Sequence, residues 1–208
     1  DGHIVDVVAL GALCKRYDAA LILDEAHAVG ARGPSGRGIA ADVGVVPDVV
    51  IGTFGKAFGT FGAFVASTRA VADLLWNRAR SFVFSTGMPP SVAAATRAAL
   101  DIVCGAEGDE RRRTLVANAI RFRTSVQRAG GTRDGAIAPV RVDNDRRVMA
   151  LSAALLEHGV FVQGIRPPTV PVGTARLRVS LSAAHTLAQV EHAASAITAT
   201  LGASATGR

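Results

Sequence analysis

LILDEAH at residues 21–27 and GTFGK at residues 52–56 are the two stretches that organise the rest of the sequence. In both, a short apolar run is followed directly by residues that carry reactive groups. The run from Ala19 to Leu23 is wholly apolar, which predicts a strand covered on both faces. Residues 49–51 predict a second strand. Short strands that alternate with helical segments are typical of an α/β sheet.

Apolar spacing predicts further elements around these strands. Residues 4–17 have helical spacing, with Val8, Leu10 and Leu13 as the expected buried positions. Further strands are expected at residues 61–66, 137–142, 160–162 and 175–181, and further helices at residues 69–80, 91–103, 107–129, 146–158 and 187–201. We expect residues 1–100 to form part of a large α/β domain, residues 101–201 a small α+β domain, and residues 202–208 a flexible tail.

The composition indicates a globular protein, because 49% of the 208 residues are hydrophobic and 19% are charged. The net charge of +6 is carried mostly by arginines that lie beside acidic residues. The run at residues 111–113 follows an acidic stretch, which favours a solvated helix face over a nucleic-acid contact. No membrane segment, signal peptide or metal site is expected. Cys14 and Cys104 are expected to be reduced thiols in a cytoplasmic protein.

Four side chains follow the two predicted strands. Ligands of open α/β sheets bind beyond the carboxyl ends of the strands, where Asp24, His27, Thr53 and Lys56 are expected to lie. An amine near a carboxylate suits pyridoxal phosphate (PLP), since a lysine holds the aldehyde and a carboxylate keeps the pyridine nitrogen protonated. Taken singly, each residue also has an ordinary explanation: a solvated lysine, a helix N-cap or a core histidine.

DEAH at residues 24–27 also spells the acidic box of nucleotide-driven helicases. A phosphate-binding loop, however, needs a serine or threonine directly after its Gly-Lys pair and lies before the acidic box. Here Ala57 follows Lys56, and both come after residues 24–27. The sequence therefore argues against a helicase.

Longer motifs continue this pattern in order along the chain. They are LDEAHAVG at residues 23–30, GPSGRG at 33–38, GTFGKAFG at 52–59, RARSFVFST at 78–86 with a Pro-Pro pair at 89–90, IRPPTVP at 165–171, RLR at 176–178 and SAAHT at 182–186. Together they resemble the α-oxoamine synthase family of PLP-dependent enzymes, from Asp1 to about Leu201.

The resemblance implies a fold-type-I, aspartate aminotransferase-like α/β fold. It also implies a reaction in which an amino acid and an acyl thioester condense and carbon dioxide is released. The RPPTVP element is most similar to the biotin-pathway branch of the family, which implies L-alanine and pimeloyl-CoA or a pimeloyl carrier protein as substrates. Glycine C-acetyltransferase, or another family member, is the alternative; a non-catalytic scaffold or inactive fragment is a third.

The resemblance assigns a role to each candidate site residue. Lys56 would form the Schiff base with PLP, Asp24 would pair with its ring nitrogen, and His27 would bond its 3-hydroxyl group. Thr53 would serve the cofactor phosphate or the surroundings of the lysine. Thr169 would reach the cofactor phosphate of the partner subunit, since the family implies a homodimer with a shared active site.

Two arginines are candidates for substrate binding. Arg178 is expected to grip the substrate carboxylate with two parallel hydrogen bonds, and Arg166 is the second candidate. Arg176 and Arg178 lie on a predicted strand, where we expect only one of them to face inward. Family members carry a comparable length of chain before the position of Asp1. We therefore expect this chain to be the carboxyl-terminal part of the enzyme, with weak or no turnover alone.

Overall fold

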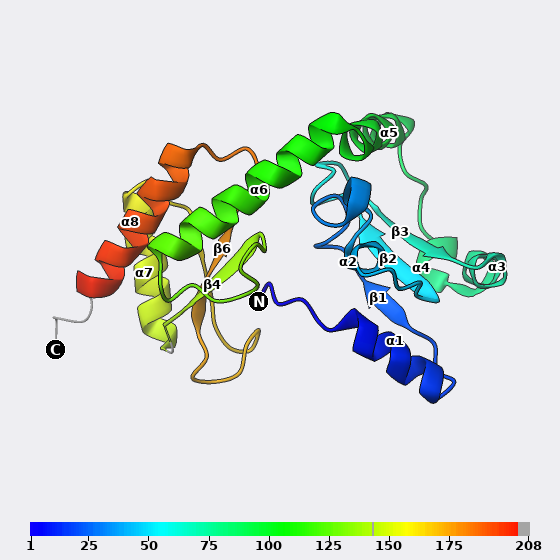
Figure 1. Ribbon diagram of the computed structural model, residues 1–208, viewed down its shortest axis with the longest axis horizontal. Coiled ribbons are helices and arrows are strands. Elements are labelled where there is room, and N and C mark those ends of the chain that lie inside the picture. The colour runs from blue at the N-terminus through cyan, green and yellow to red at the C-terminus, as the bar shows by residue number, and fades with distance from the viewer. Residues whose placement is uncertain (143, 204–208) are drawn as a thin grey trace. The chain divides into compact units, whose positions relative to one another are not determined.

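The computed structural model describes residues 1–142 and 144–203. Contacts divide the chain into two compact units, described here separately (Figure 1). The Lys56 unit comprises Val5–Arg112, and the Arg178 unit comprises Asp1–Ile4 together with the chain from Arg113 onward. The predicted boundary lies after residue 100, whereas this division lies after Arg112, within helix α6 (Ala106–Ser125). Most of the predicted tail, from residue 204, lies outside the described residues.

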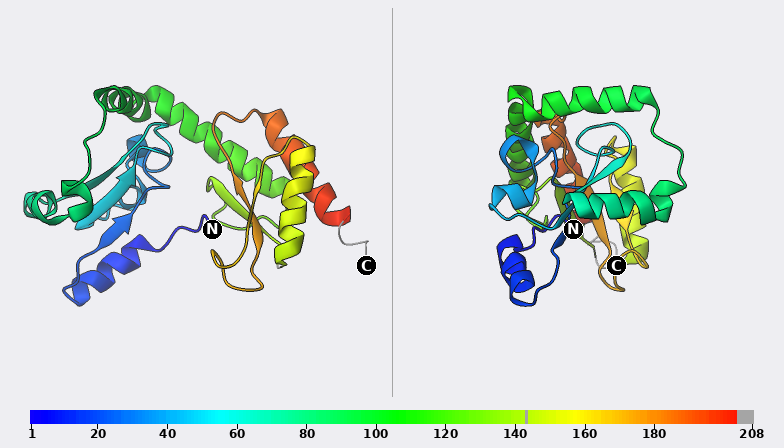
Figure 2. Two further views of the ribbon diagram at one scale, coloured as in Figure 1. Left: turned by 180° about the vertical axis from the view of Figure 1, so that it is seen from behind. Right: turned by 90° about the vertical axis from the view of Figure 1, so that its right-hand side faces the viewer.

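The Lys56 unit is built on a three-stranded sheet of order β1-β2-β3 (Figure 2). β1 and β2 are parallel, while β3 runs antiparallel to β2. The elements are α1 (Val7–Arg16), β1 (Ile22–Asp24), the 3-10 turn η1 (Pro34–Gly36), α2 (Ile39–Asp42), β2 (Val49–Thr53), β3 (Ala63–Ser67), α3 (Arg69–Arg78), α4 (Arg80–Val83), α5 (Pro90–Cys104) and the start of α6.

β1 is covered on one face only, so the prediction of a strand buried on both faces was wrong. Leu21 and Leu23 are buried in a small core with Val7 and Ala40. Ile22, which points to the opposite face, keeps 60% of its surface exposed. An apolar run identifies a strand, but the number of layers around it depends on the packing of other elements.

The buried stripe of α1 also differs from the prediction. Val8, Leu10 and Leu13 are exposed. The helix instead buries Val7, and partly buried Cys14 packs against the same core. The helix is therefore rotated about its axis relative to the predicted orientation.

The Arg178 unit contains a second three-stranded sheet, of order β4-β6-β5, in which all the neighbouring strands are antiparallel. Its elements are the rest of α6, β4 (Ile137–Arg141), α7 (Asp145–Glu157), β5 (Gln163–Ile165), β6 (Arg176–Ser180) and α8 (Leu187–Ala203). α6, α7 and α8 pack against the sheet around a large core that includes Phe122, Leu151, Leu177 and Ile197 (Figures 1 and 2). The strand predicted at residues 160–162 begins later, at Gln163.

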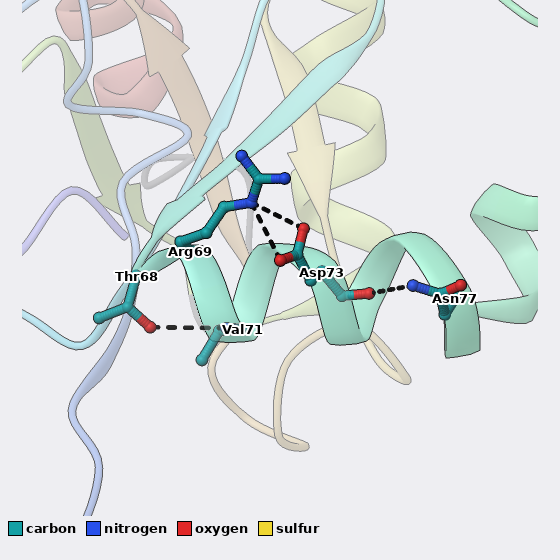
Figure 3. Close-up of polar contacts among 5 residues, drawn as sticks. All are labelled: Thr68, Arg69, Val71, Asp73 and Asn77. Atoms are coloured by element: carbon teal, nitrogen blue, oxygen red, sulfur yellow. Dashed lines mark hydrogen bonds and ion pairs between the residues drawn. The ribbon is translucent and has the colours of Figure 1, made fainter.

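Local polar contacts define α3, which has no buried residues (Figure 3). The Thr68 hydroxyl accepts from the Val71 amide at 3.5 Å. Arg69 Nε donates to both carboxylate oxygens of Asp73, one turn later, at 2.8 and 2.9 Å, and Asn77 donates to the Asp73 carbonyl at 2.7 Å. Capping and i,i+4 contacts of this kind stabilise a helix that has little core to bury.

Candidate functional site

The parallel pairing of β1 with β2 brings their carboxyl ends to one edge of the sheet. Asp24 is the last residue of β1 and pairs with Ile51 of β2. Thr53 is the last residue of β2, and Lys56 lies three residues later in the sequence. The structure therefore brings Asp24, His27, Thr53 and Lys56 to the same edge of the sheet, as the sequence predicts.

Lys56 lies in a turn between β2 and β3 whose ends are joined. The Phe54 amide donates to the Gly62 carbonyl at 2.9 Å, and the Thr60 amide donates to the Phe54 carbonyl at 2.8 Å. The Thr60 hydroxyl lies 2.9 Å from that of Thr96 on α5, which ties the turn to the helix. Lys56 itself is exposed, and its amine has no hydrogen bond or ion pair with any described residue.

The hydroxyl of Thr53 bonds within this turn. It donates to the Gly62 carbonyl at 3.0 Å and accepts from the Gly55 amide at 3.2 Å. A hydroxyl has one proton to donate, so Thr53 in this position has none left for a phosphate oxygen. Of the two roles predicted for Thr53, the geometry favours support of the lysine turn.

Asp24 and His27 are both exposed at the end of β1. Asp24 Oδ1 accepts from the Ala26 amide at 2.9 Å. His27 lies in the turn that follows, which is closed where the Ala28 and Val29 amides donate to the Glu25 carbonyl at 2.8 and 2.9 Å. The carboxylate and the imidazole are thus carried by one short, hydrogen-bonded segment.

The glycine-rich loop after His27 is fixed from α6. Within the loop, the Gly30 amide donates to the Gly36 carbonyl at 2.7 Å. Arg112 Nη1 donates to the Gly30 carbonyl at 3.2 Å and to the Val103 carbonyl at 3.0 Å, and its side chain is only 11% exposed. The prediction of a solvated basic run was therefore wrong for Arg112, although Arg111 is exposed. The side chain of Arg112 is largely buried because it bonds to the glycine-rich loop. The sequence of α6 alone does not reveal this contact.

Glu25 is a buried residue of the site to which the sequence interpretation gave no role. It is 4% exposed, and its carboxylate accepts from the amides of Ile39 and Ala40. A signal for it exists in the sequence. Leu21, Leu23 and Glu25 follow one another at a spacing of two, which places all three on the same face of an extended strand. A carboxylate in register with two buried leucines is expected to have a specific partner.

The other three candidate residues belong to the Arg178 unit. Arg166 and Thr169 are exposed in one turn after β5, where the Thr169 amide donates to the Arg166 carbonyl at 3.1 Å. Arg178 lies on β6 and is partly buried. The candidate site residues thus form two groups, one in each unit.

Arg176 and Arg178 face the same side of β6, so the expectation that only one of them could face inward was wrong. Residues two apart on a strand share a face. The intervening Leu177 is fully buried on the opposite face, and both arginines are partly exposed. Arg176 pairs with the carboxylate of Asp1 and donates to the Thr174 carbonyl.

Three general features of the described residues bear on the class of site. Cys14 and Cys104 are free cysteines. Within residues 1–142 and 144–203, no group of three or more His, Cys, Asp or Glu side chains is placed to hold a metal ion. None of the helices in the described part of the chain is both long and apolar enough to cross a membrane.

Comparison with known proteins identifies the class to which this fold and site belong. The model of the aminotransferase class I and II family matches residues 3–197, and the chain belongs to this family. It is 46% identical over 202 residues to 8-amino-7-oxononanoate synthase of Geotalea daltonii and 48% identical over 202 residues to that of Geobacter sulfurreducens. Each match covers 95% of this chain and 51% or 52% of the relative. The chain thus spans about half the length of the curated relatives it matches.

Solved structures agree with this assignment. A structure of serine palmitoyltransferase from S. paucimobilis with a bound PLP-myriocin aldimine superimposes with a TM-score of 0.90 and 32% sequence identity. The match covers 97% of this chain and 53% of that chain. The predicted fold-type-I class and the resemblance to the α-oxoamine synthases are confirmed.

Proposed function

We propose that the chain carries the cofactor-attachment residues of a PLP-dependent acyltransferase of the biotin pathway. The reaction would join L-alanine to the pimeloyl group of pimeloyl-CoA or a pimeloyl carrier protein. It would release carbon dioxide and the free thiol of CoA or the carrier, and it would form 8-amino-7-oxononanoate. One structural observation carries the proposal: Asp24, His27, Thr53 and Lys56 meet at one edge of the sheet. The identity of 46–48% to 8-amino-7-oxononanoate synthases supports the choice of reaction.

The side chains at this edge fit PLP in their chemistry. Lys56 offers an exposed amine without a partner among the described residues, which could hold the aldehyde carbon of the cofactor. Asp24 offers an exposed carboxylate for the pyridine nitrogen, and His27 offers a ring nitrogen for the 3-hydroxyl group. When bound, PLP supplies an electron-accepting ring that stabilises negative charge on the α-carbon of the amino acid.

The residues of the chain then have separate tasks. Lys56 Nζ would take the proton from the α-carbon of alanine and return it after decarboxylation. Thr53 would keep the lysine turn closed through its bonds to Gly55 and Gly62. Arg178 would hold the substrate carboxylate between two parallel hydrogen bonds, with Arg166 as the second candidate.

We further propose that the active protein is a homodimer with shared active sites. Thr169 would then bind the cofactor phosphate of the partner subunit. Its exposure in the turn with Arg166 leaves its hydroxyl accessible for such a contact. Light scattering with and without PLP would measure the mass; a monomer that binds PLP fully would contradict this part of the proposal.

The decisive test uses the fact that the chain contains two lysines, Lys15 and Lys56. The protein is incubated with PLP and reduced with borohydride, and the modified peptide is identified by mass spectrometry. We expect the reduced cofactor on the peptide that contains Lys56. Lys56→Ala should abolish both the trapped adduct and the visible absorbance band, since no other side chain at this edge is an amine.

Lys15→Ala is the matched control, because Lys15 is also exposed but lies in the last turn of α1. This variant should retain the full adduct. Equal trapping in the Lys56→Ala protein would overturn the proposal. The absence of PLP binding by the unaltered protein would favour a non-catalytic scaffold or an inactive fragment.

Substrate choice is tested separately on protein loaded with PLP. Carbon dioxide release is compared for L-alanine with pimeloyl-CoA, glycine with acetyl-CoA, and L-serine with palmitoyl-CoA. The last pair is included because of the structural similarity to serine palmitoyltransferase. We expect the first pair to give the highest kcat/KM; a higher value for either other pair would assign the chain to another member of the family.

A further inference from the structure

Glu25 follows β1 directly and lies between the two proposed cofactor ligands Asp24 and His27 in the sequence. Every polar group of Glu25 is bonded. Its amide donates to the Ile51 carbonyl of β2 at 2.8 Å. Its carboxylate accepts from the Ile39 amide through Oε2 at 2.6 Å and from the Ala40 amide through Oε1 at 2.8 Å. The residue is 4% exposed. A buried carboxylate that accepts two amide hydrogen bonds is held in one position.

The loop has no side chain where the carboxylate lies. Gly38 has a φ of +93°, and a Cβ atom built on it would lie 2.2 Å from Glu25 Oε2. Any other residue at position 38 would push the carboxylate away from the Ile39 amide, in addition to being strained by its own backbone conformation. Glu25 and Gly38 therefore fit each other closely.

Through these bonds Glu25 joins the two ends of the loop at residues 26–38. The side chain of Glu25 holds the end at residues 39–40, while its carbonyl accepts from the Ala28 and Val29 amides in the turn that carries His27. Asp24, on the other side, has its carboxylate oriented by the Ala26 amide. A displacement of Glu25 would therefore move both neighbours that the proposed function assigns to the cofactor.

We propose that Glu25 is a positioning residue, which fixes Asp24 and His27 at the edge of the sheet by joining the end of β1 to the start of α2. The inference rests on the proposed function, because the orientation of Asp24 and His27 matters only if they hold PLP. A carboxylate is required here because both of its oxygens accept from amides. A glutamine would present its NH₂ group to one of the two N–H donors.

The test compares Glu25→Gln with Asp48→Asn. Asp48 is a matched control because its Oδ2 accepts from the Leu21 amide at 2.7 Å, which is also a carboxylate–amide bond to this sheet. It lies before β2, at the end of the sheet opposite to Lys56. Both substitutions replace one carboxylate oxygen by an NH₂ group. Urea unfolding of both variants is therefore measured as well, and it reports how much of any change in the Kd follows from stability alone.

Two measurements are made on each protein. Hydrogen exchange reports the protection of the amides of Ile39, Ala40 and the turn at residues 26–29. Titration of the visible absorbance band reports the Kd for PLP. Glu25→Gln should speed exchange at these amides and raise the Kd by about tenfold or more, the effect of losing one charge-assisted hydrogen bond. Asp48→Asn should leave the Kd within about twofold, the scale of a remote surface change.

Three outcomes oppose the inference, and they are distinguishable. A Kd that Glu25→Gln leaves unchanged, while exchange is faster, would make Glu25 merely structural. A rise in Kd that is equal in Asp48→Asn would attribute the effect to general instability. Failure of the unaltered protein to bind PLP would overturn the proposed function itself. If circular dichroism shows Glu25→Gln to be unfolded, Glu25→Asp replaces it, since the shorter carboxylate keeps the charge but cannot reach both amides.

Discussion

Two arginines on α6 show how differently one residue type contributes to stability. Arg121 forms an ion pair with Glu191 in which both side chains are about half exposed. Arg123, two residues later, donates to four carbonyl oxygens at 2.6–3.2 Å. These belong to Ala119, Gly130, Gly135 and Ile137. The guanidinium thus holds the segment between α6 and β4 in place.

We expect Arg123→Ala to lower the free energy of unfolding by about 3 kcal/mol, since it leaves carbonyl groups without a donor. Arg121→Ala should cost less than about 1 kcal/mol, because exposed ion pairs contribute little. Urea unfolding of both variants measures the difference. Equal losses would show that the carbonyls around Arg123 are satisfied by water.

At the residue scale, the reactive side chains of the site could be predicted from the sequence, but the residues that hold them in place could not. Lys56, Asp24 and His27 carry reactive groups directly after apolar runs, so their positions follow from sheet topology. Glu25 and Arg112 act through burial and through bonds to a loop. Those bonds exist only after residues distant in the sequence have come together.

At the scale of elements, β1 places neighbouring apolar residues on opposite faces of the sheet, one buried and one exposed. Leu23 lies in a core with Val7, Leu21 and Ala40, whereas Ile22 is 60% exposed. We expect Leu23→Ala to cost about 2–5 kcal/mol through lost burial and a cavity. Ile22→Thr should change stability by less than about 0.5 kcal/mol, because threonine also favours extended backbone.

Chemical denaturation of the two variants measures their free energies of unfolding and so tests whether the sheet face that carries Ile22 is exposed in solution. A cost for Ile22→Thr as large as that for Leu23→Ala would show that Ile22 is buried in solution. The intended control is Val46→Thr, since Val46 is 93% exposed in a loop and should be neutral.

Most elements could be predicted from periodicity, but their surroundings could not. The helix expected at residues 187–201 is α8 at Leu187–Ala203, and the strand expected at 137–142 is β4 at Ile137–Arg141. The same approach placed a strand at residues 160–162. In the structure Val160 and Val162 are buried in the core, yet β5 starts at Gln163. Apolar residues mark burial, whereas ladder hydrogen bonds define the strand.

At the scale of the whole molecule, the two units have cores of very different size. Among the residues that the structure describes, the main core of the Arg178 unit contains nineteen buried apolar residues, while that of the Lys56 unit contains four. Buried apolar area is the main stabilising contribution to folding. We expect the Lys56 unit to unfold first, at lower urea concentration.

Hydrogen exchange in increasing urea measures this directly. Amides of β1 and β2 should lose protection before those of β4 and β6. PLP should raise the protection of the Lys56 unit selectively, because a ligand stabilises the state that binds it. Loss of protection in all four strands at the same urea concentration would contradict two separate cores.

The segment Asp1–Ile4 belongs to the Arg178 unit, although the rest of that unit follows residue 112. The Ile4 amide bonds to the Thr132 hydroxyl, and Asp1 pairs with Arg176, 175 residues further along the chain. On the ribosome, at about 5–20 residues per second, Asp1 would wait roughly 10–35 s for Arg176 to be made. The Lys56 unit has time to form before that. The Arg178 unit can close only after Arg176 has been made, whereas every residue of the Lys56 unit precedes Arg113.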